Sequence, residues 1–207
     1  AYHLYHYYQK EVITAKENAK LTLITKQAEL DNLSAQLNPH FLFNSLNSIK
    51  SLVVENPNVA RRAIDLLSDL LRSSLYDKDK DLIPIKNELS LIYDYIELEK
   101  MRFEERLQLK TDIDKELINY KIPTLSIQLL IENAIKHGID LIVGGGVVYL
   151  EIKRNNNAIC IKVENPGIIN KNKNSGLGLE NLKKRLAIQY KSKASFSLQQ
   201  IEKDKVC

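Results

Sequence analysis

The chain has 207 residues, of which 44% are apolar and 27% charged, the balance of an ordinary globular protein with one large or two small domains. The formal net charge is +4 and the lysines are scattered without a long basic run, so the composition gives no support for direct nucleic-acid binding. The two cysteines, Cys160 and Cys207, lie far apart without metal-ligand spacing and are expected to be reduced. No apolar run approaches the roughly 20 residues of a membrane span, so membrane attachment is expected only through segments upstream of residue 1.

Tyrosines crowd the start of the chain, at Tyr2, Tyr5, Tyr7 and Tyr8. Aromatic clusters of this kind mark membrane interfaces, and a surface patch or a dimer contact is an equally simple alternative. The first interpretation predicts that the chain is the cytoplasmic portion of an inner- or plasma-membrane protein.

A long helix is predicted from about residue 11 to residue 52, interrupted only by Pro39. The apolar residues before the proline have the 3-then-4 spacing of a coiled coil, whereas those after it follow 4-3-4 spacing and are out of phase with the first set. The two sets are Leu30, Leu33 and Leu37, then Leu42, Leu46, Ile49 and Val53. Because a proline can kink a helix, we predict a register change near Pro39 that turns His40 outward.

His40 stands out because it directly follows Pro39 inside a densely apolar stretch, residues 37–49. Asn44 comes four residues later and therefore shares a helical face with His40. A plain buried helix needs neither the proline nor the histidine, so we expect this stretch to present the imidazole for chemistry.

A turn at residues 55–58 and a second amphipathic helix, at about residues 59–76, predict an antiparallel helical hairpin. One hairpin has too small an interior to be stable alone, whereas two hairpins make a four-helix bundle. We therefore predict a homodimer.

The charged segment 77–81 marks a domain boundary, which divides the chain into a coiled-coil and hairpin dimerisation domain, 1–78, and a second domain, 79–207.

The second domain alternates helical and strand patterns, which predicts an α+β fold: an α/β sandwich with helices packed on a mostly antiparallel sheet. Helices are expected at about residues 84–101, 123–137 and 176–190. Strands are expected at 107–113, at 148–163 as a hairpin that turns at 155–157, and at 195–201.

The helix that ends before Gly138 carries Glu132, Asn133 and Lys136 on the stripe opposite its apolar face. An amide oxygen suits Mg²⁺ and an ammonium group suits phosphate, so this stripe is a candidate site for a metal-bound phosphate. An ordinary solvated helix face is the alternative for this stripe taken alone.

Two further segments are candidates for nucleotide contacts. Gly176 and Gly178 lie just before a helix, where glycines permit close backbone approach and free N–H groups attract an anion, although a loop-to-helix junction is the simpler explanation. Asn165 ends a strand before Pro166 and Gly167, where its amide could pair with adenine or serve as turn chemistry alone.

Taken together, these motifs resemble the cytoplasmic part of the LytS-type sensor histidine kinases, whose phosphoacceptor box reads His-Phe-Leu-Phe-Asn. The second half also resembles the wider ATPase superfamily of gyrase, Hsp90 and histidine kinases. The matching segments are Leu37–Asn44, Glu132–Gly138, Gly176–Leu186 and Arg102–Phe103, and the resemblance extends over nearly the whole chain from about residue 28.

The resemblance implies roles for individual residues. His40 would be the phosphoacceptor, and Asn133 would bind the Mg²⁺ that bridges the phosphates of ATP. Lys136 and His137 would contact phosphate or ribose. Gly176 and Gly178 would hinge a lid over the nucleotide.

The first glycine box departs from the family pattern, because the adenine-reading aspartate is Asn165 and the second glycine of the box is Ile169. Gly167 remains in place. An amide oxygen can still accept a hydrogen bond from the adenine amine, so ATP binding is expected to survive.

The predicted function is that of a sensor histidine kinase of a two-component system. ATP phosphorylates His40, and the phosphoryl group then passes to an aspartate of a response regulator, which the family suggests has a LytTR-type DNA-binding domain. Phe41 stands where many histidine kinases have an acid, so Asn44 or Glu132 would orient the imidazole, and we favour Glu132. The alternatives are a catalytically weak or inactive nucleotide-binding dimeric scaffold, and an ATPase in which Glu132 activates water.

Overall fold

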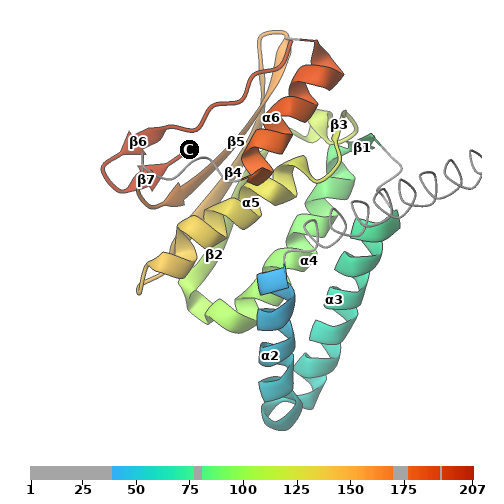
Figure 1. The fold of residues 1–207 in the computed structure, drawn as a ribbon, viewed down its shortest axis with the longest axis vertical. Helices are drawn as coiled ribbons and strands as arrows, with labels where there is room; N and C mark the ends of the chain where they lie inside the picture. The colour runs from blue at the N-terminus through green and yellow to red at the C-terminus, as the bar shows by residue number, and fades with distance from the viewer. Residues whose placement is uncertain (1–38, 77–80, 170–176, 192) are drawn as a thin grey trace, which may run out of the picture. The chain divides into compact units, whose positions relative to one another are not determined.

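The computed structural model describes residues 39–76, 81–169, 177–191 and 193–207 (Figure 1). The predicted coiled-coil seam at Leu30, Leu33 and Leu37 and the predicted lid residue Gly176 lie outside the described residues. The chain divides into two compact units, Ala1–Leu46 and Asn47–Cys207, which we describe separately. None of the described helices is long and apolar enough to cross a membrane.

The helices α2 (Pro39–Glu55) and α3 (Pro57–Tyr76) are joined by Asn56 alone, so the turn is shorter than the four residues predicted. Proline is tolerated in the first turn of a helix, where its missing N–H has no intrahelical partner. The Val59 amide donates to Asn56 Oδ1 at 3.3 Å, which makes Asn56 the side-chain cap of α3. The cap and the proline together start the second helix immediately after the first one ends.

The main sheet has five strands in the order β2-β4-β5-β7-β6. These are β2 (Leu107–Ile113), β4 (Gly146–Asn155), β5 (Ala158–Pro166), β6 (Gln200–Glu202) and β7 (Lys205–Val206). The β2–β4 pair is parallel and the other pairs are antiparallel. The predicted helical hairpin and mostly antiparallel α/β sandwich are confirmed.

The predicted strand at 195–201 is wrong in its bounds. Regular pairing is confined to Gln200–Glu202, and backbone hydrogen bonds join Gln199 to Cys207 in both directions. The partner strand, β7, spans only Lys205–Val206, so within the described part of the chain no strand pairs with the residues before Gln199.

The sequence patterns did not predict several short elements. The strands β1 (Leu82–Pro84) and β3 (Lys121–Pro123) form a small antiparallel sheet of their own. Three short 3-10 helices are η2 (Glu104–Arg106), η3 (Lys115–Leu117) and η4 (Ile139–Leu141).

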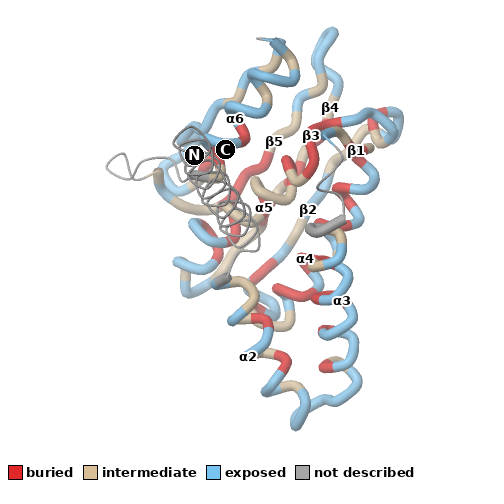
Figure 2. The backbone as a smooth tube through the Cα atoms, turned by 45° about the vertical axis from the view of Figure 1, so that its right-hand side comes forward, coloured by how far each residue is buried: buried red, intermediate tan, exposed pale blue. Residues whose placement is uncertain are grey.

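One face of the main sheet is buried under helices. Along β4 the side chains of Val148, Leu150 and Ile152 are fully buried, whereas those between them are not. The helices α4 (Ile85–Phe103), α5 (Ser126–His137) and α6 (Leu177–Tyr190) lie together on one side of the strands in Figure 1. Figure 2 shows the buried positions concentrated where these helices and the central strands meet. The fold is therefore a two-layer sandwich with α5 in the middle of the helical layer.

The amino end of α5 is capped by a carboxylate from α4. Glu88 is fully buried, and it accepts hydrogen bonds from the amides of Leu125, of Ile127 at 3.0 Å and of Gln128 at 3.3 Å. The N-cap residue of α5, Leu125, makes no side-chain cap and has a left-handed backbone with φ of 61°. A negative charge at a helix amino end also complements the helix dipole. Glu88 therefore supplies from another helix the cap that the local sequence lacks.

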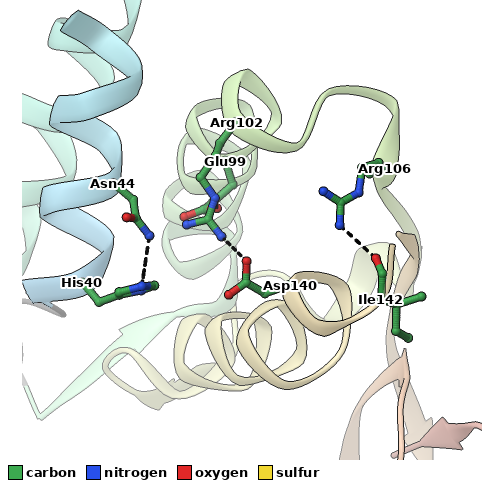
Figure 3. Close-up of polar contacts among 7 residues, drawn as sticks. All are labelled: His40, Asn44, Glu99, Arg102, Arg106, Asp140 and Ile142. Atoms are coloured by element: carbon green, nitrogen blue, oxygen red, sulfur yellow. Dashed lines mark hydrogen bonds and ion pairs between the residues drawn. The ribbon is translucent and has the colours of Figure 1, made fainter. Parts of the chain in front are cut away.

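The segment after α5 is tied to the other end of α4 (Figure 3). Arg102 donates to Asp140 Oδ1 at 2.7 Å, and its Nε lies 3.7 Å from Glu99 Oε2. Arg106 donates to the Ile142 carbonyl at 2.9 Å. Among the described residues, Glu99 Oε2 is buried without a hydrogen-bond partner. Burial accordingly raises the pKa of Glu99 from 4.5 to about 7.

We predict that Glu88→Gln lowers the free energy of unfolding by about 2 kcal/mol, because the amide turns an NH₂ group toward backbone donors that need an acceptor. Urea unfolding of the two proteins measures the difference. Glu116→Gln, at an exposed position, is the matched control and should be neutral. Equal stability of wild type and Glu88→Gln would contradict the capping role.

A pH-dependent prediction concerns Glu99. Its pKa is higher in the folded protein than the ordinary value of 4.5, so the folded state binds its proton more tightly than the unfolded chain does. The stability that comes from this proton is present at low pH and is lost as pH rises toward about 7. Glu99→Gln should therefore gain stability relative to wild type between pH 5 and pH 8, by on the order of 3 kcal/mol.

Urea unfolding at the two pH values tests this prediction. Exposed Glu105→Gln serves as the control and should show no such trend. A wild-type-minus-variant difference that does not change with pH would show that Glu99 keeps an ordinary pKa in the folded protein.

Candidate functional site

In the first unit, the side chains of His40 and Asn44 lie next to each other on α2 (Figure 3). The Asn44 amide nitrogen is 3.3 Å from both His40 Nδ1 and His40 Nε2. His40 is exposed, as the spacing predicted, although the proposed register change rests on residues outside the described part of the chain. The amide can donate to whichever ring nitrogen is unprotonated, so it orients the imidazole without selecting one tautomer.

In the second unit, α5 buries one face and exposes the candidate residues on the other. Ile127, Ile131 and Ala134 are buried as predicted, whereas Leu130 is only half-buried and Ile135 takes its place in the core. Glu132 and Asn133 are half-buried, and Lys136 and His137 are exposed.

Glu132 has an altered affinity for protons. Burial raises the pKa of its carboxyl group, against the opposing effects of a hydrogen bond and of the nearby Lys136 charge. The bond runs from Gln128 Nε2 to Glu132 Oε1 and is 2.9 Å long. A carboxylate with a raised pKa is a better proton acceptor near neutral pH than an ordinary glutamate.

The carboxyl end of α5 lies against the end of β5. A Cβ atom at Gly138 would lie 2.5 Å from the Pro166 carbonyl oxygen and 2.6 Å from Asn165 Nδ2, so only glycine fits there. Gly167 has a φ of 147° and faces the His137 carbonyl, 3.2 Å from the position that its Cβ would occupy. The fold therefore brings together two segments, Glu132–Gly138 and Asn165–Gly167, that are far apart in the sequence.

Asn165 is buried at this junction, and its two amide atoms have different surroundings. Its Nδ2 donates to the Pro166 carbonyl at 2.8 Å. Because the nitrogen is used in this way, Oδ1 is the atom that can accept a hydrogen bond from an amine.

The start of α6 packs on the middle of α5. A Cβ atom at Gly178 would lie 2.9 Å from Leu129 Cδ1, which is closer than a side chain could approach without displacing Leu129. Gly176, the other glycine of this pair, lies outside the described residues. The predicted segments that the structure describes in this unit thus converge on one helix, α5.

Sequence patterns missed the side chains that hold α5 in place. Glu88 looks like any solvated glutamate on a helix, yet it is fully buried. Arg185 donates from α6 to the Thr124 carbonyl at 2.6 Å, although the sequence marked it only as part of a longer motif. A charge in a helical pattern predicts exposure, so no local signal identifies either residue.

Comparisons with known proteins agree with these observations. The family model described as histidine kinase matches residues 28–107. Sensor histidine kinase YpdA of Escherichia coli is 44% identical over 159 residues, which are 77% of this chain and 27% of that protein. Sensor protein LytS of Oceanobacillus iheyensis is 32% identical over 190 residues, which are 84% of this chain and 32% of that protein.

Among solved structures, the histidine kinase domain of the blue-light activated histidine kinase EL346 from Erythrobacter litoralis aligns with a TM-score of 0.47 and 16% identity. That alignment covers 76% of this chain and 80% of the other. The chain spans about a third or less of the length of the curated relatives named above. With its motifs and most of its length shared with these relatives, the chain is related to the LytS-type sensor histidine kinases.

Proposed function

We propose that this chain is the kinase core of a two-component sensor: ATP phosphorylates His40, and the phosphoryl group then passes to an aspartate of a response regulator. The observation that carries the proposal is the convergence on α5 of the segments Glu132–Gly138 and Asn165–Gly167 with Gly178. Close backbone approach at these glycines brings Asn165 against the end of α5, the helix that carries Lys136 and His137.

The proposed nucleotide contacts follow from the chemistry of each group. Asn165 Oδ1 would accept from the adenine amine, since the amide nitrogen is already bonded to the Pro166 carbonyl. Lys136 is exposed and would neutralise phosphate, with His137 beside it on phosphate or ribose. Gly176 and Gly178 would hinge the lid over the nucleotide.

The proposed metal is Mg²⁺, held by Asn133. Mg²⁺ is usually bound through one or two protein oxygens together with phosphate oxygens. A half-buried amide on the same helix as Lys136 fits that requirement. When bound, the ion would neutralise the negative charge that develops on the phosphates.

In the proposed reaction, a ring nitrogen of neutral His40 attacks the γ-phosphorus, and the bond to the oxygen that bridges the β- and γ-phosphates breaks, so ADP leaves. Asn44 orients the imidazole. The phosphorylated ring then carries one positive charge, and Glu132 accepts the proton from its other nitrogen. The raised pKa of Glu132 supports this assignment.

The proposed partners are a second copy of the chain and a response regulator with a LytTR-type DNA-binding domain. Large apolar side chains are exposed along α2: Phe43 is 68% exposed, Leu46 53%, Val53 53% and Val54 85%. An apolar helix face of this kind supports a four-helix bundle formed by two hairpins. We place the chain in the cytoplasm, as part of a membrane-bound receptor.

The main test is labelling with [γ-³²P]ATP. The wild-type chain should acquire a label that acid removes and alkali does not, because a phosphorylated imidazole is labile to acid. His40→Gln should fall to background while it still binds ATP, and exposed Lys50→Gln on the same helix should label normally. A wild-type chain that binds ATP without being labelled would instead support the inactive scaffold.

A second test separates the roles of two neighbouring residues on α5. Glu132→Gln should lower the rate of autophosphorylation by about 10²–10⁴-fold with ATP affinity little changed, because a proton acceptor is lost. Asn133→Ala should weaken ATP binding in Mg²⁺ and have little effect on binding in EDTA. Rapid-quench labelling and equilibrium binding measure the two quantities. Loss of ATP affinity in Glu132→Gln would assign that residue to binding.

A further inference from the structure

The carbonyl and hydroxyl groups at the start of α5 receive hydrogen bonds from α6. One Arg185 nitrogen lies 2.6 Å from the Thr124 carbonyl oxygen and 3.4 Å from Ser126 Oγ. Ser126 Oγ in turn donates to the Pro123 carbonyl at 2.5 Å. A guanidinium group is suited to such a place because its donors point in fixed directions.

Arg185 and Glu88 act on the same helix end with opposite charges. Glu88 accepts hydrogen bonds from the free amides at the start of α5. Burial lowers the pKa of Arg185, and the negative charge of Glu88 acts in the opposite direction. The charge of Arg185 likewise helps to keep Glu88 ionised against the effect of burial. Three helices, α4, α5 and α6, therefore meet in one electrostatic network at residues 124–128.

α6 touches α5 at a second place, where Gly178 packs against Leu129. Gly178 and Arg185 are about two helical turns apart on α6. Their contacts on α5 follow in the opposite order along the chain, so the two helices run antiparallel. Together with the buried Leu179 and Leu182, these two contacts hold α6 in its direction relative to α5, and Arg185 supplies the polar contact at the amino end of α5.

We propose that Arg185, with Glu88, is a positioning residue that locks α6 onto the amino end of α5 and thereby sets the affinity for the nucleotide. The inference rests on the proposed function, in which Gly178, in the first turn of α6, contacts a nucleotide held by α5. When Arg185 is lost, α6 keeps the contact of Gly178 with Leu129 but loses its hydrogen bonds to the amino end of α5, and Gly178 is held less firmly relative to Asn133.

The test compares Arg185→Met, Arg185→Lys and the neighbouring exposed Lys184→Met in the full 207-residue chain. Binding of trinitrophenyl-ATP, competed with ATP, gives Kd, and autophosphorylation gives KM and kcat. Arg185→Met should raise Kd and KM about tenfold and change kcat less than about twofold. Arg185→Lys should recover part of the affinity, since an ammonium group can still donate to the Thr124 carbonyl. Lys184→Met should match wild type.

A double-mutant cycle tests the pairing with Glu88. If the two residues act as one unit, Glu88→Gln combined with Arg185→Met should raise Kd by far less than the product of the two single effects. If the rise in Kd of the double variant equals the product of the two single rises, the pairing of Glu88 with Arg185 is overturned. An unchanged Kd in Arg185→Met, or a kcat that falls as much as KM rises, would overturn the positioning role.

Hydrogen exchange without nucleotide separates this inference from the proposed function. The amides of Ile127 and Gln128 should exchange faster in Arg185→Met than in wild type or Lys184→Met, whether or not His40 is ever labelled. Unchanged exchange at these amides would overturn the lock itself. Absent labelling of His40 together with faster exchange would count against the kinase and in favour of the lock.

Discussion

The second unit depends on one buried interaction, the carboxylate of Glu88 at the amino end of α5. The first turn of every helix leaves N–H groups without intrahelical partners, and Leu125, with its left-handed backbone, has no side chain that can serve them. Glu88 reaches across from α4 to accept three of these amides while fully buried. The helix that carries Asn133, Lys136 and His137 is therefore held by a residue outside every motif.

The rest of α5 is fixed by close backbone contacts. At Gly138 and Gly178 an added Cβ would come within 3 Å of neighbouring atoms, so the end of β5 and the start of α6 can approach the helix only because these residues are glycines. Asn165 joins this arrangement through its bond to the Pro166 carbonyl. Where the family has an aspartate, this chain thus has a buried amide whose oxygen is the proposed acceptor for the adenine amine.

Two acids, Glu99 on α4 and Glu132 on α5, are present although burial opposes the ionisation of each. The pKa values of Glu99 and Glu132 are both raised, chiefly by loss of water, and the Glu132 carboxylate also disfavours the charge of Glu99. Arg102 offsets part of this cost at Glu99 and binds Asp140 in the segment that follows α5. Acids with perturbed pKa values are typical of functional sites, and Glu132 is the residue to which we assign proton transfer.

Local pattern was sufficient for the described α-helices and for the β4–β5 hairpin, because apolar periodicity and glycine or proline punctuation are properties of short segments. The His40–Asn44 pair also followed from helical spacing alone. The sequence did not reveal β1, β3 or the short extent of β6, since strand pairing depends on which partner strand is available. Nor did it reveal Glu88, Arg185 or the meeting of Gly138 with Asn165. The pattern around buried Glu88 reads locally as a solvated helix face, and only the tertiary structure supplies the helix end that makes its burial tolerable. Arg185 is exposed, but its partner at the start of α5 lies far away in the sequence.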